Sequence, residues 1–136
     1  MTELDPQLNR LPAALQKSPV GAKVHLAGIG GVAMAALAGL LLEAGAQVTG
    51  SDGDVYPPVS DLLRDMNISP AQGYGLETLP ADCDLAVIGN VVTRQFPVLE
   101  ALRERRVPYL SLPQALGQWF LGQAQPGAEG LKNLVV

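Results

Sequence analysis

The sequence is poor in the residues that most often carry out covalent chemistry. Its 136 residues include a single cysteine, Cys83, and a single histidine, His25. One cysteine cannot form an internal disulfide, and it fits a reducing compartment. A lone histidine inside an apolar run supports neither a metal cluster nor a Ser-His-Asp triad. We therefore expect a binding domain that has no catalytic residue and no metal site of its own.

Further absences narrow the class of protein. Charged residues make up only 16% of the chain and the net charge is −4, which argues against a nucleic-acid surface. No apolar run is long enough to span a membrane, and the N-terminus lacks the features of a signal peptide. The phosphate loop Gly-x-x-x-x-Gly-Lys-Ser/Thr is also missing. These absences predict a cytoplasmic protein with neither a nucleic-acid nor a membrane partner.

What is present is a glycine turn around which the chain is organised. Residues 24–34 have the pattern of a buried strand, a turn and the start of a helix, with the fingerprint Gly28-x-Gly30-x-x-Ala33. Gly28 permits a sharp reversal, and Gly30 and Gly31 let a ligand approach the backbone. The amides and the positive dipole end of the helix suit a pyrophosphate. A tight turn that holds no ligand is the alternative.

An acidic residue ends the second expected strand, residues 47–52. Asp52 lies about 20 residues past the last glycine of the fingerprint, where a ribose-binding carboxylate is expected. The loop 53–60 follows, and in it Tyr56 either stacks on a base or sugar or packs on the next helix. The pattern predicts a phosphate and a ribose without specifying the nucleotide.

The alternation of apolar strands and helices predicts an α/β fold, a Rossmann-like three-layer domain with a mostly parallel five-stranded sheet. Pro108 places the last strand at an edge of the sheet. Beyond the first βαβ unit, residues 23–52, we expect strands at 68–73, 84–89 and 107–110, helices at 30–44, 59–66, 97–106 and 111–121, and a single helical turn within 76–81.

The loop after the fourth strand is a second candidate binding segment. In a doubly wound sheet, the loops after the first and fourth strands flank the point where ligands bind. Asn90, Thr93 and Arg94 are therefore candidates for polar contacts with a ligand. Arg94 could offer a bidentate fork to a phosphate or carboxylate, or could be a surface arginine without a partner.

With these motifs in hand, the chain resembles the N-terminal domain of the Mur ligases of bacterial cell-wall synthesis. The resemblance covers about residues 24–121, and residues 28–34 and 48–52 match the muramate-binding members. Tyr56-Pro57-Pro58, residues 88–94 followed by Pro97, and residues 107–111 are similar to the branch that ligates a murein tripeptide in peptidoglycan recycling. The alanine-adding branch is the alternative within the family.

The resemblance implies a three-domain enzyme that binds a UDP-sugar, ATP and an amino acid or peptide in successive domains. An acyl phosphate forms on the muramyl carboxylate and the amine attacks it. UDP-N-acetylmuramate is then the partner, with its diphosphate on the glycine turn, Asp52 at the ribose or uracil, and the loop after the fourth strand near the diphosphate or muramyl end. The implied site comprises Gly28, Ile29, Gly30, Gly31, Val32, Ser51, Asp52, Tyr56, Asn90, Thr93 and Arg94.

The resemblance also divides the chain. Residues 1–22 are an extension, residues 23–121 the UDP-sugar-binding domain, and residues 122–136 a linker and the start of an ATP-binding domain. ATP and Mg²⁺ are expected for the full-length enzyme, whereas this chain alone lacks the ATP site and needs no cofactor. Two other functions stay open. One is the nicotinamide-dinucleotide domain of an oxidoreductase, although the Tyr-Pro-Pro loop alters the space for an adenosine, and the other is a scaffold domain with an empty turn.

Overall fold

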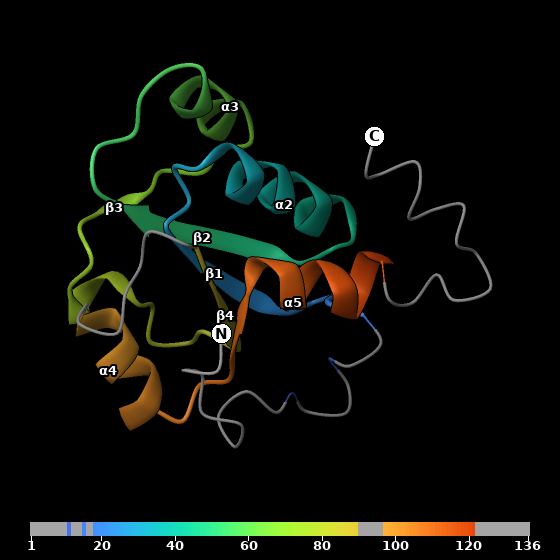
Figure 1. The fold of residues 1–136 in the computed structure, drawn as a ribbon, viewed down its shortest axis with the longest axis vertical. Coiled ribbons are helices and arrows are strands. Elements are labelled where there is room, and N and C mark those ends of the chain that lie inside the picture. Colours follow the sequence, from blue (N-terminus) through green and yellow to red (C-terminus); the bar gives the residue numbers. More distant parts are fainter. Residues whose placement is uncertain (1–10, 12–14, 16–17, 90–96, 122–136) are drawn as a thin grey trace.

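The structure, a computed structural model, describes residues 11, 15, 18–89 and 97–121. Its centre is a five-stranded sheet in the order β3-β2-β1-β4-β5, and every neighbouring pair is parallel (Figure 1). This confirms the predicted α/β class and its parallel sheet. The strands are β1 (Lys23–Ala27), β2 (Gln47–Asp52), β3 (Ala71–Gln72), β4 (Leu85–Ile88) and β5 (Tyr109–Ser111).

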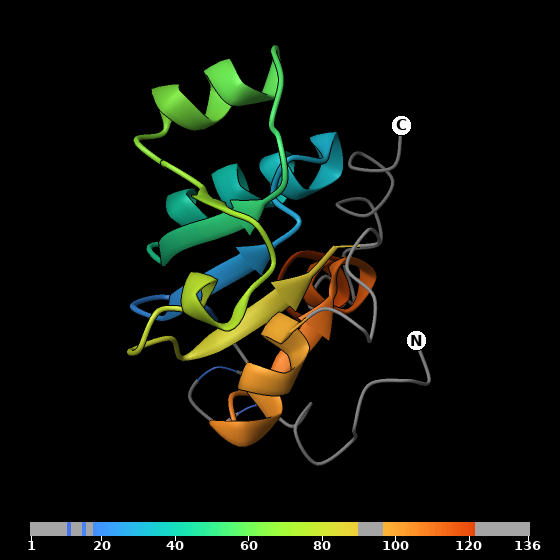
Figure 2. The same cartoon turned by 90° about the vertical axis from the view of Figure 1, so that its left-hand side faces the viewer.

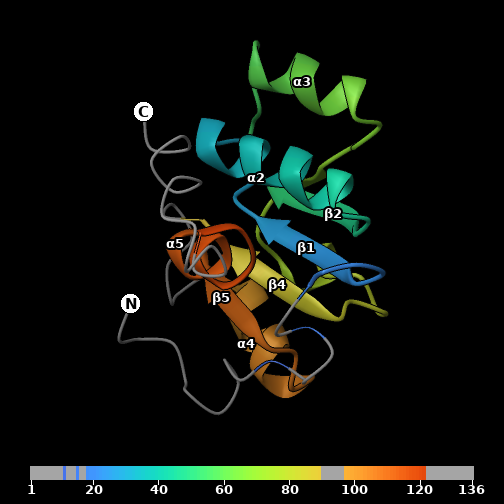
Figure 3. The ribbon, with the colours of Figure 1, turned by 90° about the vertical axis from the view of Figure 1, so that its right-hand side faces the viewer.

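Helices cover both faces of the sheet, as the three-layer prediction requires. Helix α2 (Val32–Glu43) and helix α5 (Leu112–Leu116), which continues as a π-helical turn (Gly117–Leu121), pack against one face (Figure 3). Helix α3 (Val59–Asp65) lies beside α2. Helix α4 (Pro97–Glu104) and the 3₁₀ turn Leu76–Thr78 cover the opposite face (Figure 2).

The two central strands show why these residues form a sheet that is buried on both sides. In β4, Leu85 and Val87 join the core beneath α2 and α5, whereas Ala86 and Ile88 join the core beneath α4. Successive side chains of a strand point to opposite faces, so an unbroken apolar run supplies both cores at once. Each helix then needs only one apolar stripe to complete its layer.

Several predicted boundaries differ from the observed ones, and three of these differences bear on the site or the sheet. Helix α2 begins at Val32 rather than at residue 30, because Gly31 keeps an extended backbone with φ −76° and ψ 148°. β3 is only two residues long, far shorter than the predicted 68–73. β5 lies at the edge of the sheet, as Pro108 predicted, but it starts one residue after that proline.

The segment before β1 contributes to the core. Leu11 is buried beneath the α2 and α5 layer, and Leu15 packs against the same cluster. The indole Nε1 of Trp119 donates a hydrogen bond to the Leu15 carbonyl at 2.7 Å. Trp119 is only 7% exposed, so it is a core residue rather than an open docking face.

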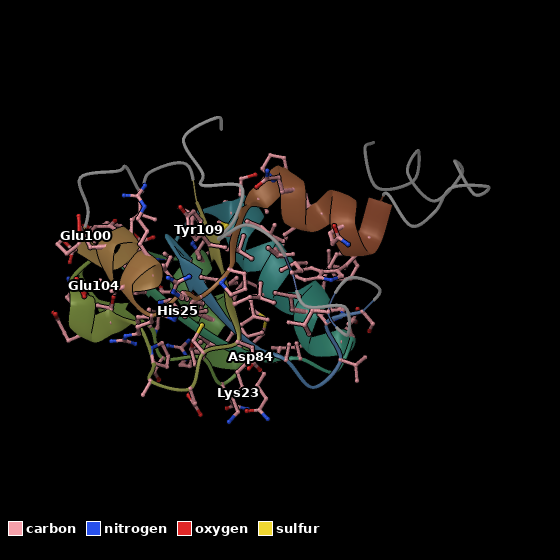
Figure 4. The ribbon with its side chains drawn as sticks, turned by 90° about the horizontal axis from the view of Figure 1, so that it is seen from below. Lys23, His25, Asp84, Glu100, Glu104 and Tyr109 are labelled. Atoms are coloured by element: carbon pink, nitrogen blue, oxygen red, sulfur yellow. The ribbon has the colours of Figure 1, made fainter. Side chains whose placement is uncertain are left out.

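The charged residues of α4 are placed on its outer side. In α4, Glu100 and Glu104 point away from the sheet while Val98 and Leu102 are buried against it (Figure 4). The helix is therefore amphipathic, with its charged side chains in solvent. Among the helices that the structure describes, none combines the length and the apolar character that crossing a membrane requires.

Candidate functional site

The glycine turn crosses the carboxyl end of β2. The amides of Gly28 and Ile29 both donate to the Ser51 carbonyl, at 2.7 and 3.1 Å. Gly28 has φ +90°, a conformation that side chains rarely adopt, so glycine is needed there. The Ile29 side chain is fully buried, and a Cβ on Gly50 would overlap it. The turn is therefore anchored from below by β2.

The start of α2 presents amides to the space above the turn. No side chain in the described chain caps the helix at Gly31, and the first turn holds no acidic residue. The N–H groups of a first helical turn have no partner within the helix, and the helix dipole is positive at this end. Val32, predicted as a site residue, is 73% exposed at this position. The arrangement favours an anion.

Asp52 holds the turn in place through its carboxylate. Its Oδ2 accepts a hydrogen bond from the Gly30 amide at 2.6 Å, and its Oδ1 accepts from the Gly53 amide at 2.8 Å. The Tyr74 hydroxyl also donates to Oδ1. Asp52 is 8% exposed, yet it lines the pocket over the turn. Asp52, which the sequence predicts to bind a ribose, therefore also fixes the conformation of the turn.

A pocket of about 440 Å³ lies over the turn. Backbone amides and glycines form one side, carboxylates form another, and apolar side chains close it. Such a pocket can hold an anion at the amides and hydroxyl or imide donors at the carboxylates. The lining residues are Gly28, Gly30, Gly31, Val32, Ala33, Met34, Asp52, Asp54, Tyr74 and Leu112.

Tyr56 lies near the carboxylates but does not line this pocket. Its hydroxyl donates to Asp54 Oδ2 at 3.3 Å, while Gln72 Nε2 donates to Asp54 Oδ1 at 3.1 Å. The side chain of Tyr56 is 68% exposed, so it is not packed into the core beneath α3. Of the two roles considered for Tyr56, the structure leaves the ring accessible to a ligand.

The Ser51 side chain faces the interior rather than the pocket. It is 0% exposed, and its Oγ lies 3.0 Å from His25 Nε2, while His25 Nδ1 lies 2.8 Å from Thr49 Oγ1. Burial lowers the pKa of His25 to about 4, so the imidazole is neutral at pH 7. Ser51 and Ile29 therefore serve the site through the backbone of the turn.

Three predicted site residues lie outside the described part of the chain, and two polar residues that line the pocket were not predicted. Asn90, Thr93 and Arg94 lie outside the described residues. Cys83 has no activating partner among the described side chains, and burial raises the pKa of its thiol to about 11. The sequence analysis did not single out Asp54 and Tyr74. A usable signal existed, since Tyr74 follows β3, whose Gln72 pairs with Asp52 at the same edge of the sheet.

Comparison with known proteins identifies the family. Residues 23–123 match the model described as "Mur ligase family, catalytic domain". The chain belongs to the Mur ligase family. It is 44% identical over 99 residues to the UDP-N-acetylmuramate–L-alanyl-gamma-D-glutamyl-meso-2,6-diaminoheptandioate ligase of Escherichia coli strain K12, covering 73% of this chain and 22% of that protein.

The UDP-N-acetylmuramate–L-alanine ligases are a second branch of the family, and the example given next is less similar to this chain than the Escherichia coli ligase is. The UDP-N-acetylmuramate–L-alanine ligase of Solidesulfovibrio magneticus is 35% identical over 96 residues, covering 71% of this chain and 21% of that ligase. This chain thus spans about a fifth of the length of these relatives. The higher identity to the Escherichia coli ligase confirms the predicted resemblance to the branch that ligates a murein tripeptide.

Solved structures of Mur ligases share the fold. The UDP-N-acetylmuramate:L-alanyl-gamma-D-glutamyl-meso-diaminopimelate ligase of Neisseria meningitides superimposes with a TM-score of 0.70 at 38% identity, covering 76% of this chain and 32% of that one. The murein peptide ligase of Psychrobacter arcticus 273-4 gives a TM-score of 0.67 at 37% identity, covering 71% and 20%. These comparisons favour the ligase prediction over the oxidoreductase alternative.

Proposed function

We propose that this chain is the UDP-N-acetylmuramate-binding part of an ATP-dependent Mur ligase that attaches a peptide to the muramate nucleotide during cell-wall recycling. The observation that carries the proposal is the pocket that is lined both by the first residues of α2 and by the Asp52 carboxylate. A diphosphate and a nucleoside need those two kinds of group side by side. The names of the similar ligases supply the nucleotide.

Within this proposal each predicted site residue has a task. The turn of Gly28, Gly30 and Gly31 and the first amides of α2, near Val32, receive the diphosphate. Asp52 meets the ribose or uracil, and Tyr56 stacks on the nucleoside. Ile29 and Ser51 support the turn from within. Asn90, Thr93 and Arg94 follow β4, and they approach the diphosphate or the muramyl end.

We assign no residue of this chain to ATP or Mg²⁺. Within the described ranges, no group of three or more His, Cys, Asp or Glu side chains could hold a metal ion. Because the family resemblance implies a separate ATP-binding domain, we propose that the ATP-dependent activation of the muramyl carboxylate takes place outside residues 23–121. The proposal keeps residues 1–22 as an extension and residues 122–136 as the way to an ATP-binding domain. It also keeps the cytoplasmic location.

The test is a calorimetric titration of the chain with UDP-N-acetylmuramate, UDP and NADH. We expect the muramate nucleotide to bind, UDP to bind more weakly, and NADH to give no heat. Asp52→Ala should weaken binding because it removes a nucleoside contact and frees the turn. Asp61→Ala is the matched control, since it removes an equal charge from an exposed position on α3.

Arg94→Ala tests the loop after β4. We expect weaker binding of the muramate nucleotide, because a guanidinium pairs with phosphate or carboxylate oxygens. Arg64→Ala is its control, since Arg64 pairs with Asp61 on α3. Binding of NADH without any response to the two UDP compounds would overturn the proposed function and return the oxidoreductase alternative.

A further inference from the structure

We propose that Tyr74 is a positioning residue for nucleotide binding, whose hydroxyl holds the Asp52 carboxylate and, through it, the Gly30 amide at the floor of the pocket. The inference rests on the proposed function and adds a residue to it. The chain of contacts runs from the Tyr74 hydroxyl to Asp52 Oδ1, and from Asp52 Oδ2 to the Gly30 N–H at 2.6 Å. Tyr74 and Asp52 both line the pocket.

The number of hydrogen bonds explains why the hydroxyl matters. An ionised carboxylate offers about four lone-pair sites. The Gly30 amide, the Gly53 amide and the Tyr74 hydroxyl occupy three positions on Asp52. The carboxylate plane is thereby fixed from the glycine turn and from the loops that follow β2 and β3, and about one acceptor position remains for a ligand donor. Without the hydroxyl, Oδ1 keeps only the amide of the adjacent residue Gly53 among the described donors, and the Asp52 carboxylate is held by two hydrogen bonds instead of three.

Tyr74 is itself anchored, so it can serve as a fixed point. Its carbonyl accepts a hydrogen bond from the Val98 amide, in the first turn of α4, at 3.0 Å. Its ring packs against the core beneath α4. Tyr74 therefore joins the glycine turn to the helix that follows β4. The glycine turn and the start of α4 thus belong to one hydrogen-bond network.

The protonation state suits this role. The hydrogen bond to Asp52 raises the pKa of Tyr74, and burial acts in the same direction. The Tyr74 hydroxyl therefore keeps its proton near neutral pH and can donate a hydrogen bond to Asp52. A hydrogen bond from a neutral donor to a carboxylate is stronger than one between two neutral groups.

The first experiment compares Tyr74→Phe with the native chain by calorimetric titration with UDP-N-acetylmuramate. Phenylalanine keeps the ring and the backbone anchor and removes only the hydroxyl. We expect the affinity to fall about ten-fold, which corresponds to about 1.4 kcal/mol. Tyr109→Phe is the matched control, because Tyr109 is buried in the α4 core and does not line the pocket. Its affinity should equal that of the native chain.

A double-mutant cycle separates positioning from direct contact. If Tyr74 acts through Asp52, Tyr74→Phe should change the affinity much less in an Asp52→Ala chain than in the native chain. Full additivity of the two substitutions would show that Tyr74 meets the ligand by itself, and would overturn the inference. An unchanged affinity in Tyr74→Phe alone would also overturn it.

Amide hydrogen exchange provides a readout that needs no ligand. Tyr74→Phe should speed exchange at Gly30, whose acceptor becomes mobile, and leave β1 and β4 protected. If the native chain does not bind the muramate nucleotide, the proposed function fails, while this comparison still decides the positioning role. Equal exchange at Gly30 in both chains would contradict that role.

Discussion

His25 is a buried residue of β1 with a neutral imidazole, and its ring contacts side chains of the neighbouring strand β2. Both ring nitrogens lie within hydrogen-bond distance of hydroxyls, those of Thr49 and Ser51, and no charged partner is among them. The Ser51 carbonyl in turn accepts the amides of the glycine turn. The histidine thus stabilises the strand end that supports the turn. A charged imidazole in this position would lack both water and a counter-ion.

Acid should therefore destabilise the fold through His25. The pKa of His25 is lowered to about 4 in the folded chain, against 6.5 for the free side chain, because burial disfavours the charge. Between these values the unfolded chain binds the extra proton, so stability falls as pH falls. We expect a loss of about 2 kcal/mol between pH 7 and pH 5 from this group.

Urea unfolding at the two pH values measures that loss. The control is His25→Gln, which keeps an amide able to bond a hydroxyl and does not titrate. Its stability should be lower overall but flatter with pH. An equal pH dependence in both chains would assign the effect to other groups.

Gly30 lacks a side chain at a point where the Asp52 carboxylate lies close to the backbone of the turn. A Cβ there would lie 2.6 Å from Asp52 Oδ2 and 3.2 Å from Val55 Cγ2. Gly30→Ala should therefore displace the carboxylate and lower the free energy of unfolding by about 1–3 kcal/mol. Gly31→Ala is the matched control for folding, because its nearest described neighbour is the Gly28 carbonyl at 3.9 Å. Thermal denaturation of the two variants makes the comparison.

At the scale of elements, α5 is short but has a strong start. The Gln114 amide donates to Ser111 Oγ at 3.2 Å, and the Ser111 amide donates to Gln114 Oε1 at 2.8 Å. This capping box satisfies two amides that a helix start otherwise leaves without partners. It also orients the helix that carries Trp119 into the core.

Removing the cap should be felt throughout α5. Ser111→Ala should reduce the free energy of unfolding by about 1 kcal/mol. Ser60→Ala is the control, since Ser60 also lies in the first turn of a helix, and no described side chain caps α3. Equilibrium urea unfolding of both variants gives the values. Equal losses would mean that the capping box adds no stability of its own.

The whole molecule consists of two cores that share one sheet. Trp119 belongs to the core beneath α2 and α5, and Tyr109 to the core beneath α4. Since β1 and β4 supply side chains to both cores, neither core can open while the sheet stays intact. We expect one cooperative transition for the whole domain.

Leu26→Ala tests this coupling. Leu26 is fully buried in the core that contains Trp119, so the loss should be roughly 2–5 kcal/mol. The fluorescence of Trp119 and the near-ultraviolet signal of the tyrosines should shift together. Val20→Ala, at a position 66% exposed, is the control and should change little. Separate transitions for the two signals would show that the cores unfold independently.

The class of fold and the position of the glycine turn follow from local features of the sequence. Unbroken apolar runs identify strands that are buried on both faces, and glycines at fixed spacing identify a reversal that only glycine permits. Both signals are local, so a linear reading captures them. The same holds for the sheet edge at β5, because a proline cannot donate to a ladder.

Which polar groups form hydrogen bonds with one another, in contrast, follows from the folded arrangement of the strands and loops. The sequence predicts Asp52 as a residue that binds a nucleoside. In the fold, its carboxylate accepts hydrogen bonds from Gly30, Gly53 and Tyr74. Ser51 and His25 find each other across two strands. The predicted length of β3, residues 68–73, was wrong, because an edge strand is limited by its partner as much as by its own residues. Apart from the bond between Asp52 and the adjacent Gly53, these hydrogen bonds join residues more than twenty positions apart, and no local pattern encodes the distance between them.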